Sequence, residues 1–568
     1  SAGATTSRSG APYSISMEAV REFKVVTNQY DVTFGRSGGG TIAASTKAGT
    51  NTVTGSVFGF GRADWLTSKY DIRGNKRMGS YATYQYGFSL GGPIIKDKLH
   101  YFVVWDRQKD NRSLLIANIQ SPADETFYKI NQSTLDQYLN IARSKYGVSD
   151  QQQYGSIPKH RTSDAAFLRL DYQINAKNLL TLRNNFTADN NPLGLGDNTA
   201  INLLESYGND KSFDNSLLAT LRTAFSPRIT NELKVQHLYI YQNSTQGDQI
   251  NSPYIPRAIV ENINSTIDGT NLATNIQLGG HRFGQESFKN HVLQLSNNLY
   301  YDSDFAKYTF GVDLMATRSK SIYGSEVNGR FHFTNAGDIS SLDNFNSLKP
   351  YRYYREVPLK ADIAVQGTIM NMGLYGQLKK DIAPGLEMTA GLRMDYASYP
   401  TAVFNELVYQ ELGLRTDNKL QSFILQPRVQ FSWDIHNNQT DFLRFGAGIF
   451  ASDINNYMLI NNLTFDGSNL ATIDVRGDAV PTPEFDAYRK DYSSIPSLPD
   501  QQLPTINFTG EDAKVPTIYK ANIAYAKLIN ERLKVGITGY MTLARNNYTY
   551  IERNLVEDPY FRLANEAN

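Results

Sequence analysis

The chain has 568 residues, more than one compact domain usually holds, so we expect several domains, a repeat array or one very large barrel. Its mean hydropathy is negative and no stretch approaches the roughly 18 to 20 apolar residues of a spanning helix, which excludes a helical membrane bundle. Basic residues (56) and acidic residues (55) nearly balance, which argues against nucleic acid as a partner, and the lack of cysteine excludes disulfides and thiolate sites.

A glycine-rich segment comes first. Residues 22–51 read EFKVVTNQYDVTFGRSGGGTIAASTKAGTN and predict a short strand at 23–27, a turn through 35–40 and a second strand at 41–46. The turn needs residues that accept unusual backbone angles, and glycine provides them. We therefore expect a structural role in the turn, rather than ligand contact, for Gly35, Gly38, Gly39 and Gly40.

An enzyme site is not expected. The sequence Gly35-Arg36-Ser37-Gly38-Gly39 fits the G-x-S-x-G nucleophile elbow of hydrolases, but that elbow joins a strand to a helix, and here the following residues are strand-like. The seven histidines are scattered and form no metal-binding motif, so no metal site or cofactor is predicted. One lone D-x-D, Asp302 and Asp304, leaves room for Ca²⁺ in a connection.

Strand-like runs of about ten residues fill the rest of the chain. In the clearest run, at 423–433, Phe423 and Leu425 point to the opposite face from Gln426 and Arg428. One face suits lipid and the other water, and the length suits a tilted strand that crosses a bilayer. About fifteen such runs are predicted, at 52–62, 83–93, 98–108, 163–174, 178–188, 214–225, 229–242, 289–301, 306–317, 368–380, 385–396, 423–434, 440–451, 517–528 and 532–543.

Short and long connections alternate between these runs. Short connections lie at 94–97, 175–177, 226–228, 302–305, 381–384, 435–440 and 529–531, and long ones include 109–162, 243–289, 318–367 and 452–517, with the proline-rich stretch 480–516 read as an extracellular loop. This alternation is the layout of an outer-membrane barrel, with turns in the periplasm and loops outside. A soluble sandwich or propeller has no reason to keep that order.

Two further signals fit this layout. One long connection should carry a helix that Ser133 caps and Gly147 ends, with Leu135 and Leu139 on one face. Tyrosines and tryptophans near the run ends indicate girdles at the membrane interfaces, although ordinary strand-end aromatic residues would look the same. They are Trp65, Trp105, Tyr300, Tyr301 and Trp433.

Two motifs carry a family resemblance. Residues 22–51 resemble the end of the plug domain of TonB-dependent receptors, especially the Oar-like group found in Bacteroidota and other Gram-negative bacteria. Residues 89–108 (SLGGPIIKDKLHYFVVWDRQ) resemble the first barrel hairpin of that group, with its Gly-Gly-Pro strand end, short Lys-Asp-Lys turn and aromatic strand. The two motifs follow one another in the order in which the family has them.

The resemblance implies an all-β fold, a transmembrane antiparallel barrel of about 22 strands with an internal plug. About fifteen strands would be present here. We expect residues 1–51 to form the C-terminal part of the plug and residues 52–568 an incomplete barrel with long extracellular loops. The rest of the plug and its TonB-binding box, with any signal peptide, would precede Ser1, and the remaining strands would follow Asn568.

The resemblance also implies a function. It implies TonB-dependent active transport of a large or scarce substrate across the outer membrane, driven by the TonB–ExbB–ExbD complex. Outer-membrane lipids and lipopolysaccharide would be partners, and a surface lipoprotein or another envelope protein could be one. The substrate and the direction of transport stay open.

Four charged residues are candidates for holding the plug. Arg36 and Lys47 are expected to pair with acidic lumen-facing residues such as Asp171 or Asp395, or else to be solvated charges at strand ends. A different function, a non-transporting outer-membrane or secreted adhesin with binding loops, remains an alternative. The plug-like segment argues against it, because an adhesin has no use for a plug.

Overall fold

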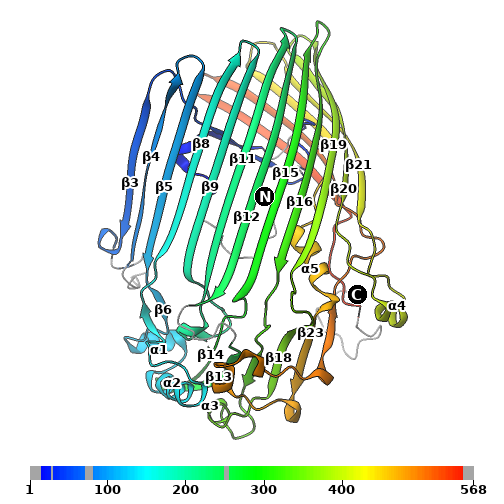
Figure 1. The fold of residues 1–568 in the computed structure, drawn as a ribbon. Helices are drawn as coiled ribbons and strands as arrows, with labels where there is room; N and C mark the ends of the chain where they lie inside the picture. The colour runs from blue at the N-terminus through cyan, green and yellow to red at the C-terminus, as the bar shows by residue number, and fades with distance from the viewer. Residues whose placement is uncertain are drawn as a thin grey trace.

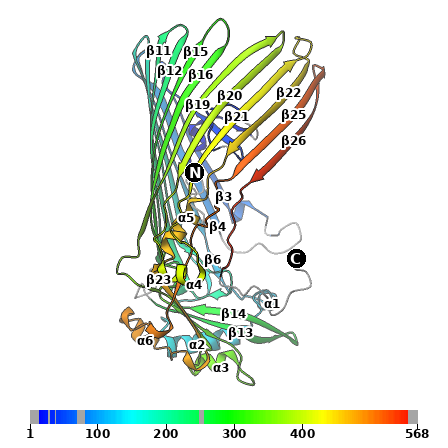
Figure 2. The same ribbon diagram turned by 90° about the vertical axis from the view of Figure 1, so that its right-hand side faces the viewer.

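One curved antiparallel sheet of fifteen strands dominates the computed structural model, which describes residues 14–26, 30–36, 38–68, 70, 81–247 and 255–553 (Figure 1). The strands follow one another in chain order and the sheet curls around a concave face, as Figure 2 shows from the side. They are β3 (Thr54–Ala63), β4 (Tyr81–Ile95), β5 (Leu99–Arg112), β8 (Arg161–Asn175), β9 (Asn178–Leu195), β11 (Gly208–Ser226), β12 (Ile229–Gln246), β15 (Gln285–Asp302), β16 (Lys307–Ile322), β19 (Val365–Ala383), β20 (Leu386–Ser398), β21 (Gln421–Asp434), β22 (Asp441–Ala451), β25 (Thr517–Asn530) and β26 (Leu533–Arg545). Within these ranges no helix has the length and apolarity that a bilayer crossing requires.

The predicted strands are confirmed. Each of the fifteen runs falls on one strand of the large sheet, and every neighbouring pair is antiparallel. The observed strands are often longer than the runs, as in β9, which has 18 residues. In β9, β11 and β12 the extra residues lie toward the long connections.

The two faces of the sheet also agree with the predicted pattern. Phe423 and Leu425 are 67% and 49% exposed on the convex face, whereas Gln426 and Arg428 are 0% and 3% exposed on the concave face. The concave face is therefore polar and filled, and the convex face is apolar. This arrangement is typical of a sheet with lipid on one side and a polar lumen on the other.

The long connections fold together into one unit, which we call the cap (Figure 1, bottom). Its centre is a seven-stranded sheet in the order β10-β14-β13-β17-β18-β23-β24. The strands are β10 (Ile201–Asn202), β13 (Arg257–Ile267), β14 (Thr270–Leu278), β17 (Arg330–Phe333), β18 (Arg352–Pro358), β23 (Asp466–Arg476) and β24 (Leu503–Ile506). The sequence predicts long loops at these positions but does not predict their common sheet, because a single connection shows no core and only the assembly of the connections buries one.

Helices complete the cap and the loop ends. They are α1 (Pro122–Tyr128), α2 (Gln132–Tyr146), α3 (Ser341–Asn346), α4 (Glu406–Leu412), α5 (Asn456–Thr464) and α6 (Phe485–Tyr488), and a small sheet joins β6 (Leu114–Ile116) to β7 (Gly155–Ile157). The predicted helix is confirmed as α2, and Gly147 ends it with a φ of 64°. Its cap is Asn131 rather than Ser133, because the Asn131 Oδ1 atom accepts a hydrogen bond from the Thr134 amide at 2.9 Å.

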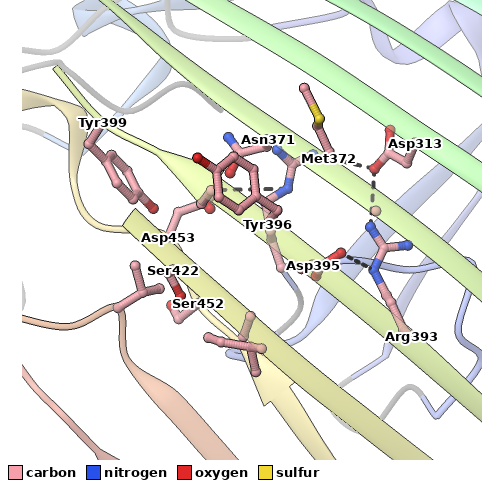
Figure 3. A pocket seen from close by; sticks show the side chains of 16 residues that line it. Asp313, Asn371, Met372, Arg393, Asp395, Tyr396, Tyr399, Ser422, Ser452 and Asp453 are labelled. Atoms are coloured by element: carbon pink, nitrogen blue, oxygen red, sulfur yellow. Dashed lines mark hydrogen bonds and ion pairs between the residues drawn. The ribbon is translucent and has the colours of Figure 1, made fainter. Parts of the chain in front are cut away.

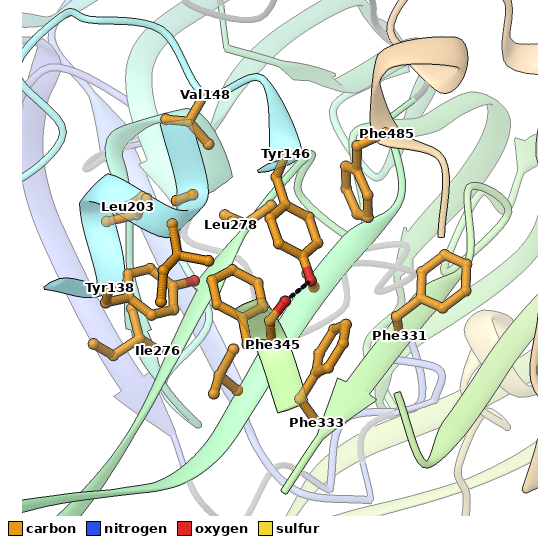
Figure 4. Packing of buried hydrophobic residues seen from close by; sticks show 14 of the residues in the cluster. Tyr138, Tyr146, Val148, Leu203, Ile276, Leu278, Phe331, Phe333, Phe345 and Phe485 are labelled. Atoms are coloured by element: carbon orange, nitrogen blue, oxygen red, sulfur yellow. Dashed lines mark hydrogen bonds between the residues drawn. The ribbon is translucent and has the colours of Figure 1, made fainter. Parts of the chain in front are cut away.

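Aromatic side chains from distant connections form the core of the cap (Figure 4). The rings of Tyr146 on α2 and Phe345 on α3 stack with centroids 4.2 Å apart, and the Tyr146 hydroxyl donates to the Phe345 carbonyl at 2.7 Å. Phe333 on β17 and Phe485 on α6 pack against Tyr146 at 6.1 Å and 4.9 Å. Three long connections therefore meet at one buried ring, which holds the cap as a single body.

Replacing Phe345 should loosen the cap and leave the large sheet intact. Phe345 is fully buried, so Phe345→Ala should cost about 3 to 5 kcal/mol in the cap. We expect proteases to cut the long connections faster, while the unboiled protein still migrates faster than the boiled protein on a gel. Phe127→Ala, at a residue that is 69% exposed, is the control. Equal cleavage of the two variants would contradict the common core.

A buried carboxyl group makes the cap sensitive to pH. Glu356 on β18 is 8% exposed, and the hydroxyl of Tyr354 donates to its Oε1 atom at 3.2 Å. Burial, with the nearby charge of Glu326, raises the pKa of Glu356 from 4.5 to about 8. The folded cap therefore keeps this proton over a range in which the unfolded chain has lost it. Its stability falls as the pH rises from 4.5 toward about 8.

Removing this titration should stabilise the cap only at high pH. Glu356→Gln replaces the protonated carboxyl by a neutral group of the same shape, so its β18 amides should exchange as in the parent protein at pH 5 and more slowly at pH 9. Hydrogen exchange of variant and parent, compared at each pH, measures this. Glu411→Gln on the exposed side of α4 should change neither value. A difference of equal size at both pH values would disprove the assignment.

Candidate functional site

Residues 14–26, 30–36 and 38–50, which we call the lumen segment, lie on the concave side of the large sheet (Figures 1 and 2). Two strands of this segment, β1 (Val20–Val26) and β2 (Thr41–Thr46), pair with each other and not with the large sheet. The predicted strand at 41–46 coincides with β2, and β1 contains most of the strand predicted at 23–27, of which Thr27 lies outside the described residues.

Two buried arginines of the sheet hold the backbone of the lumen segment. Arg428 on β21 donates through Nη1 to the carbonyl oxygens of Asp31 and Phe34 at 2.9 and 2.8 Å. Arg393 on β20 donates through Nη1 to the carbonyl of Val32 at 3.1 Å. Both guanidinium groups are nearly inaccessible, with 3% and 1% exposure, so the carbonyl oxygens replace the water that these charges have lost.

Glycines in the sheet make room for this contact. A Cβ atom at Gly446 on β22 would lie 2.2 Å from the Tyr30 ring, and one at Gly391 on β20 would lie 2.5 Å from a methyl group of Val32. The Tyr30 hydroxyl donates to Asn522 Oδ1 on β25 at 2.6 Å. The inner surface of β20, β22 and β25 is thus shaped to the chain at Tyr30–Val32.

Arg36 lies between two acidic side chains, Asp313 and Asp453, both of which are labelled in Figure 3. Its Nη2 atom is 3.7 Å from Asp313 Oδ2 on β16, and its Nε atom is 3.8 Å from Asp453 Oδ2 in the connection after β22. Asp313 is also 3.4 Å from the Arg393 guanidinium. One carboxylate therefore joins the lumen segment to an arginine of the wall, beside a pocket that Tyr399 and Asp453 help to line.

The structure assigns different partners to the acidic residues expected to pair with Arg36 and Lys47. Asp395 accepts from Arg393 Nε at 2.7 Å and Asp171 accepts from Arg169 Nε at 2.7 Å, each two residues away on the same strand. Residues two apart point to the same face of a strand, so each acid finds its own arginine first. These acids act on the lumen segment through the arginines, since Arg169 Nη1 in turn donates to the carbonyl of Thr46 at 3.2 Å.

Lys47 belongs to a second anchor, on the opposite part of the sheet. Its ammonium group lies 2.7 Å from Glu18 Oε1 within the lumen segment, and the Ser56 hydroxyl of β3 donates to the same oxygen at 3.1 Å. The hydrogen bond from Lys47 holds the pKa of Glu18 below its usual value. Ser16 donates to Asp106 Oδ2 on β5 at 2.9 Å. The lumen segment is thus tied to both sides of the curved sheet.

The four glycines of the expected turn differ in what surrounds them. A Cβ atom at Gly35 would lie 2.3 Å from the Arg393 guanidinium, and one at Gly38 would lie 2.4 Å from a methyl group of β25. Gly39 has no atom within 4 Å of that position. Gly40 has a φ of 137°. Close approach to the wall, rather than left-handed geometry, therefore explains glycine at positions 35 and 38.

The residues considered for catalysis or metal binding have the following surroundings. Ser37, the serine of the formal nucleophile elbow, lies outside the described residues. Those residues contain no group of three or more histidines or carboxylates that could hold a metal ion. Asp304 lies 2.8 Å from Arg228 and Asp302 lies 3.9 Å from Lys307, so both carboxylates already face cations. Calcium binding at this D-x-D stays a prediction.

Arg169, Arg393 and Arg428, which donate to backbone carbonyl groups of the lumen segment, are called the wall arginines. The sequence contains a pattern that marks two of them. The pentapeptides Leu-Arg-Leu-Asp-Tyr at 168–172 and Leu-Arg-Met-Asp-Tyr at 392–396 repeat one pattern on β8 and β20. In both, the structure places the arginine and the aspartate on the concave face and lets the arginine reach a backbone carbonyl of the lumen segment. Arg428 has no such repeat, and its role is visible only in the fold.

Comparisons with known proteins agree with this architecture. A family model described as an outer membrane beta barrel domain matches residues 45–126 and 116–540. The TonB-dependent transporter Oar of Myxococcus xanthus is 30% identical over 156 residues, which make up 25% of this chain and 14% of that protein.

One solved structure shows a similar fold. The outer membrane transporter YddB from Escherichia coli superposes with a TM-score of 0.53 and 14% identity, over 88% of this chain and 53% of that one. The siderophore receptor PirA from Acinetobacter baumannii gives a TM-score of 0.49 and 12% identity, over 93% and 58% of the two chains. The chain thus spans little more than half the length of these structures and a much smaller share of Oar.

Removing the Arg428 guanidinium should loosen the lumen segment. Hydrogen bonds from a charged donor contribute about 1.5 to 3 kcal/mol each, so Arg428→Met should speed amide exchange at residues 31–36 by about tenfold or more. Arg444→Met is the matched control, because Arg444 lies on the same face of β22 as Gly446 and is exposed. Hydrogen exchange measured by mass spectrometry distinguishes them. Unchanged exchange in Arg428→Met would show that other contacts hold the segment.

Proposed function

Because the chain belongs to the outer membrane β-barrel domain family, which places it in the outer membrane of Gram-negative bacteria, we propose that it is part of a TonB-dependent transporter for a large or scarce substrate. The observation that supports this proposal is that buried arginines of the large sheet donate hydrogen bonds to backbone carbonyl groups of the lumen segment. The described part of residues 1–51 would then be plug and residues 52–568 barrel.

The type of contact suits a plug that must move. The strands of the barrel are joined by continuous ladders of backbone hydrogen bonds, whereas the lumen segment is held to the sheet by separate contacts of side chains. A pulling force on the segment can break these separate contacts one after another, while the bonds of a ladder resist it together. In the proposed mechanism the TonB–ExbB–ExbD complex supplies that force, and the segment leaves the wall to open a path.

Further partners belong to the same proposal. Lipids, including lipopolysaccharide, would surround the apolar convex face. The cap would present a fixed surface to a surface lipoprotein or another envelope protein, since its connections share one buried core.

The host would be a member of the Bacteroidota, as the Oar-like motifs imply. In Figure 2 the cap lies at one end of the large sheet, so a substrate that enters from that end would pass it.

A cysteine at Gly39 should report movement of the lumen segment. The 568 residues contain no cysteine, and a Cβ atom at Gly39 meets nothing within 4 Å, so Gly39→Cys should fold normally. In intact cells we expect a membrane-impermeant maleimide to label this cysteine faster when TonB is present than in a tonB deletion strain. Asp150→Cys, at a fully exposed side chain, should be labelled at one rate in both strains.

The opposite result would favour the alternative function. If Gly39→Cys in the full-length protein is labelled at the same rate with and without TonB, while the control is labelled in both strains, the lumen segment does not move. The chain would then be a static surface barrel whose cap binds a partner.

A further inference from the structure

A pocket of about 350 Å³ lies beside Arg36 on the concave side of the large sheet, and we call it the lumen pocket (Figure 3). Its lining comes from three parts of the chain: Arg36 of the lumen segment, Tyr399 and Ile424 at β20 and β21, and Asp453 and Val515 of the connection between β22 and β25. This volume is typical of sites for small organic groups. A group bound here would touch all three parts of the chain.

The charged residues of the lumen pocket carry a net negative charge. Two arginines, Arg36 and Arg393, and three aspartates, Asp313, Asp395 and Asp453, line it. Arg393 lies 2.7 Å from Asp395 and 3.4 Å from Asp313, and Arg36 lies 3.7 Å from Asp313. Asp453 has only the Arg36 Nε atom at 3.8 Å, too far for a good hydrogen bond, and its side chain is 44% exposed. The pocket therefore favours a further cation over an anion.

Hydroxyl groups beside Asp453 can accept hydrogen bonds. Tyr399 is 5% exposed, and its hydroxyl forms no hydrogen bond with any described residue. A buried hydroxyl without a partner destabilises a fold, so a partner from outside the chain would stabilise it. The hydroxyl groups of Ser422 and Ser452 belong to the same lining (Figure 3). An ammonium group has three N–H donors and no acceptor, so one carboxylate and two hydroxyl groups can satisfy it.

Apolar side chains form another part of the lining. Ile424 and Val515 belong to it, together with Ala397 and Ala451. Apolar surface next to a carboxylate suits a methylene chain that ends in a cation, because the chain covers the apolar surface while its end meets the charge. A metal ion would leave this surface uncovered, and the described residues hold no group of three or more histidines or carboxylates that could bind one. The lining therefore fits an organic cation.

We propose that the lumen pocket binds an alkylammonium group of the substrate, such as the end of a lysine side chain or of a free aliphatic amine. The Asp453 carboxylate neutralises the charge, the Tyr399 hydroxyl accepts a hydrogen bond from the ammonium group, and Ile424 and Val515 cover the methylene chain. Because Asp453 also faces Arg36, the bound cation shares this carboxylate with the lumen segment. The proposal rests on the proposed function, since it takes the ligand to be the transported substrate.

Saturation-transfer NMR on the purified full-length protein in detergent tests this site. The probes are pentylamine, which is cationic at neutral pH, and pentanol and pentanoate, which have the same chain but are neutral and anionic. Pentylamine should bind more tightly than either. Asp453→Asn keeps the shape of the side chain and removes its charge, so the affinity for pentylamine should fall by about tenfold or more, to the level of pentanol. Tyr399→Phe keeps the ring and should weaken pentylamine binding by about threefold or more.

The control removes a carboxylate elsewhere on the sheet. Asp302, 60% exposed in its side chain and 3.9 Å from Lys307, lies in a short turn, so Asp302→Asn should bind pentylamine within about twofold of the parent. All variants must still show heat-modifiable migration, and the comparison between them cancels uptake of the probes by the detergent. The proposal is overturned if Asp453→Asn and Asp302→Asn bind pentylamine alike, or if the three probes bind the parent protein alike.

Two capped tripeptides distinguish the sources of the amine. One has a central lysine and the other a central acetyllysine, which has lost the charge. Tighter binding of the lysine peptide than of pentylamine would assign the site to a peptide or protein substrate, whereas binding of pentylamine alone would assign it to a free amine. Equal binding of the lysine and acetyllysine peptides, without a preference for pentylamine over pentanol, would overturn the proposal.

Failure of this site and failure of the proposed function give different results. Binding of pentylamine is measured without TonB. If pentylamine binds as expected while labelling of Gly39→Cys does not depend on TonB, active transport is rejected and the amine site stays. If labelling depends on TonB while pentylamine binds no better than pentanol, only the amine site is rejected.

Discussion

Backbone hydrogen bonding governs this structure. A strand in contact with lipid finds no partner for its N–H and C=O groups outside the sheet, so neighbouring strands must pair with each other. In the large sheet each inner strand pairs with two neighbours, and the edge strands β3 and β26 pair with one. Once the ladders satisfy the backbone, the two faces of each strand are free to differ. Apolar side chains take the convex face, and charged groups such as Arg393 and Arg428 can turn inward to the lumen segment.

This constraint explains why the sequence predicts the large sheet so well. A lipid face and a polar face impose an alternation of period two on every strand, which can be recognised without any knowledge of the neighbours. The run at 423–434 corresponds to β21, and the turn predicted at 175–177 joins β8 to β9. The second strand of the glycine-rich segment, at 41–46, was predicted for a similar local reason, since small and β-branched residues follow a glycine-rich turn.

The cap and the partners of the site depend on distant residues and could not be read in this way. β10 has two residues and β17 has four, too few for a period to appear. Phe345 and Tyr146 meet across almost two hundred positions of chain, and no local pattern announces that contact. The sequence identified Arg36 as a charge of the lumen segment. It could not predict that Asp313 and Asp453 lie beside Arg36, because the curvature of the sheet brings these distant residues together. Asp171 and Asp395 were found as lumen acids, yet the arginine two residues earlier was overlooked.

The wall arginines donate hydrogen bonds to main-chain oxygens, and this has an evolutionary consequence. The carbonyl groups of Asp31, Val32 and Phe34 would be present whatever side chains those positions carried. Side chains in this stretch can therefore change without loss of these hydrogen bonds, provided that Tyr30 still packs against Gly446 and that Gly35 still leaves room for the Arg393 guanidinium. The barrel residues have no such freedom, because one guanidinium serves several acceptors. Among orthologues, a nearly invariant set of arginines should therefore face a much more variable peptide.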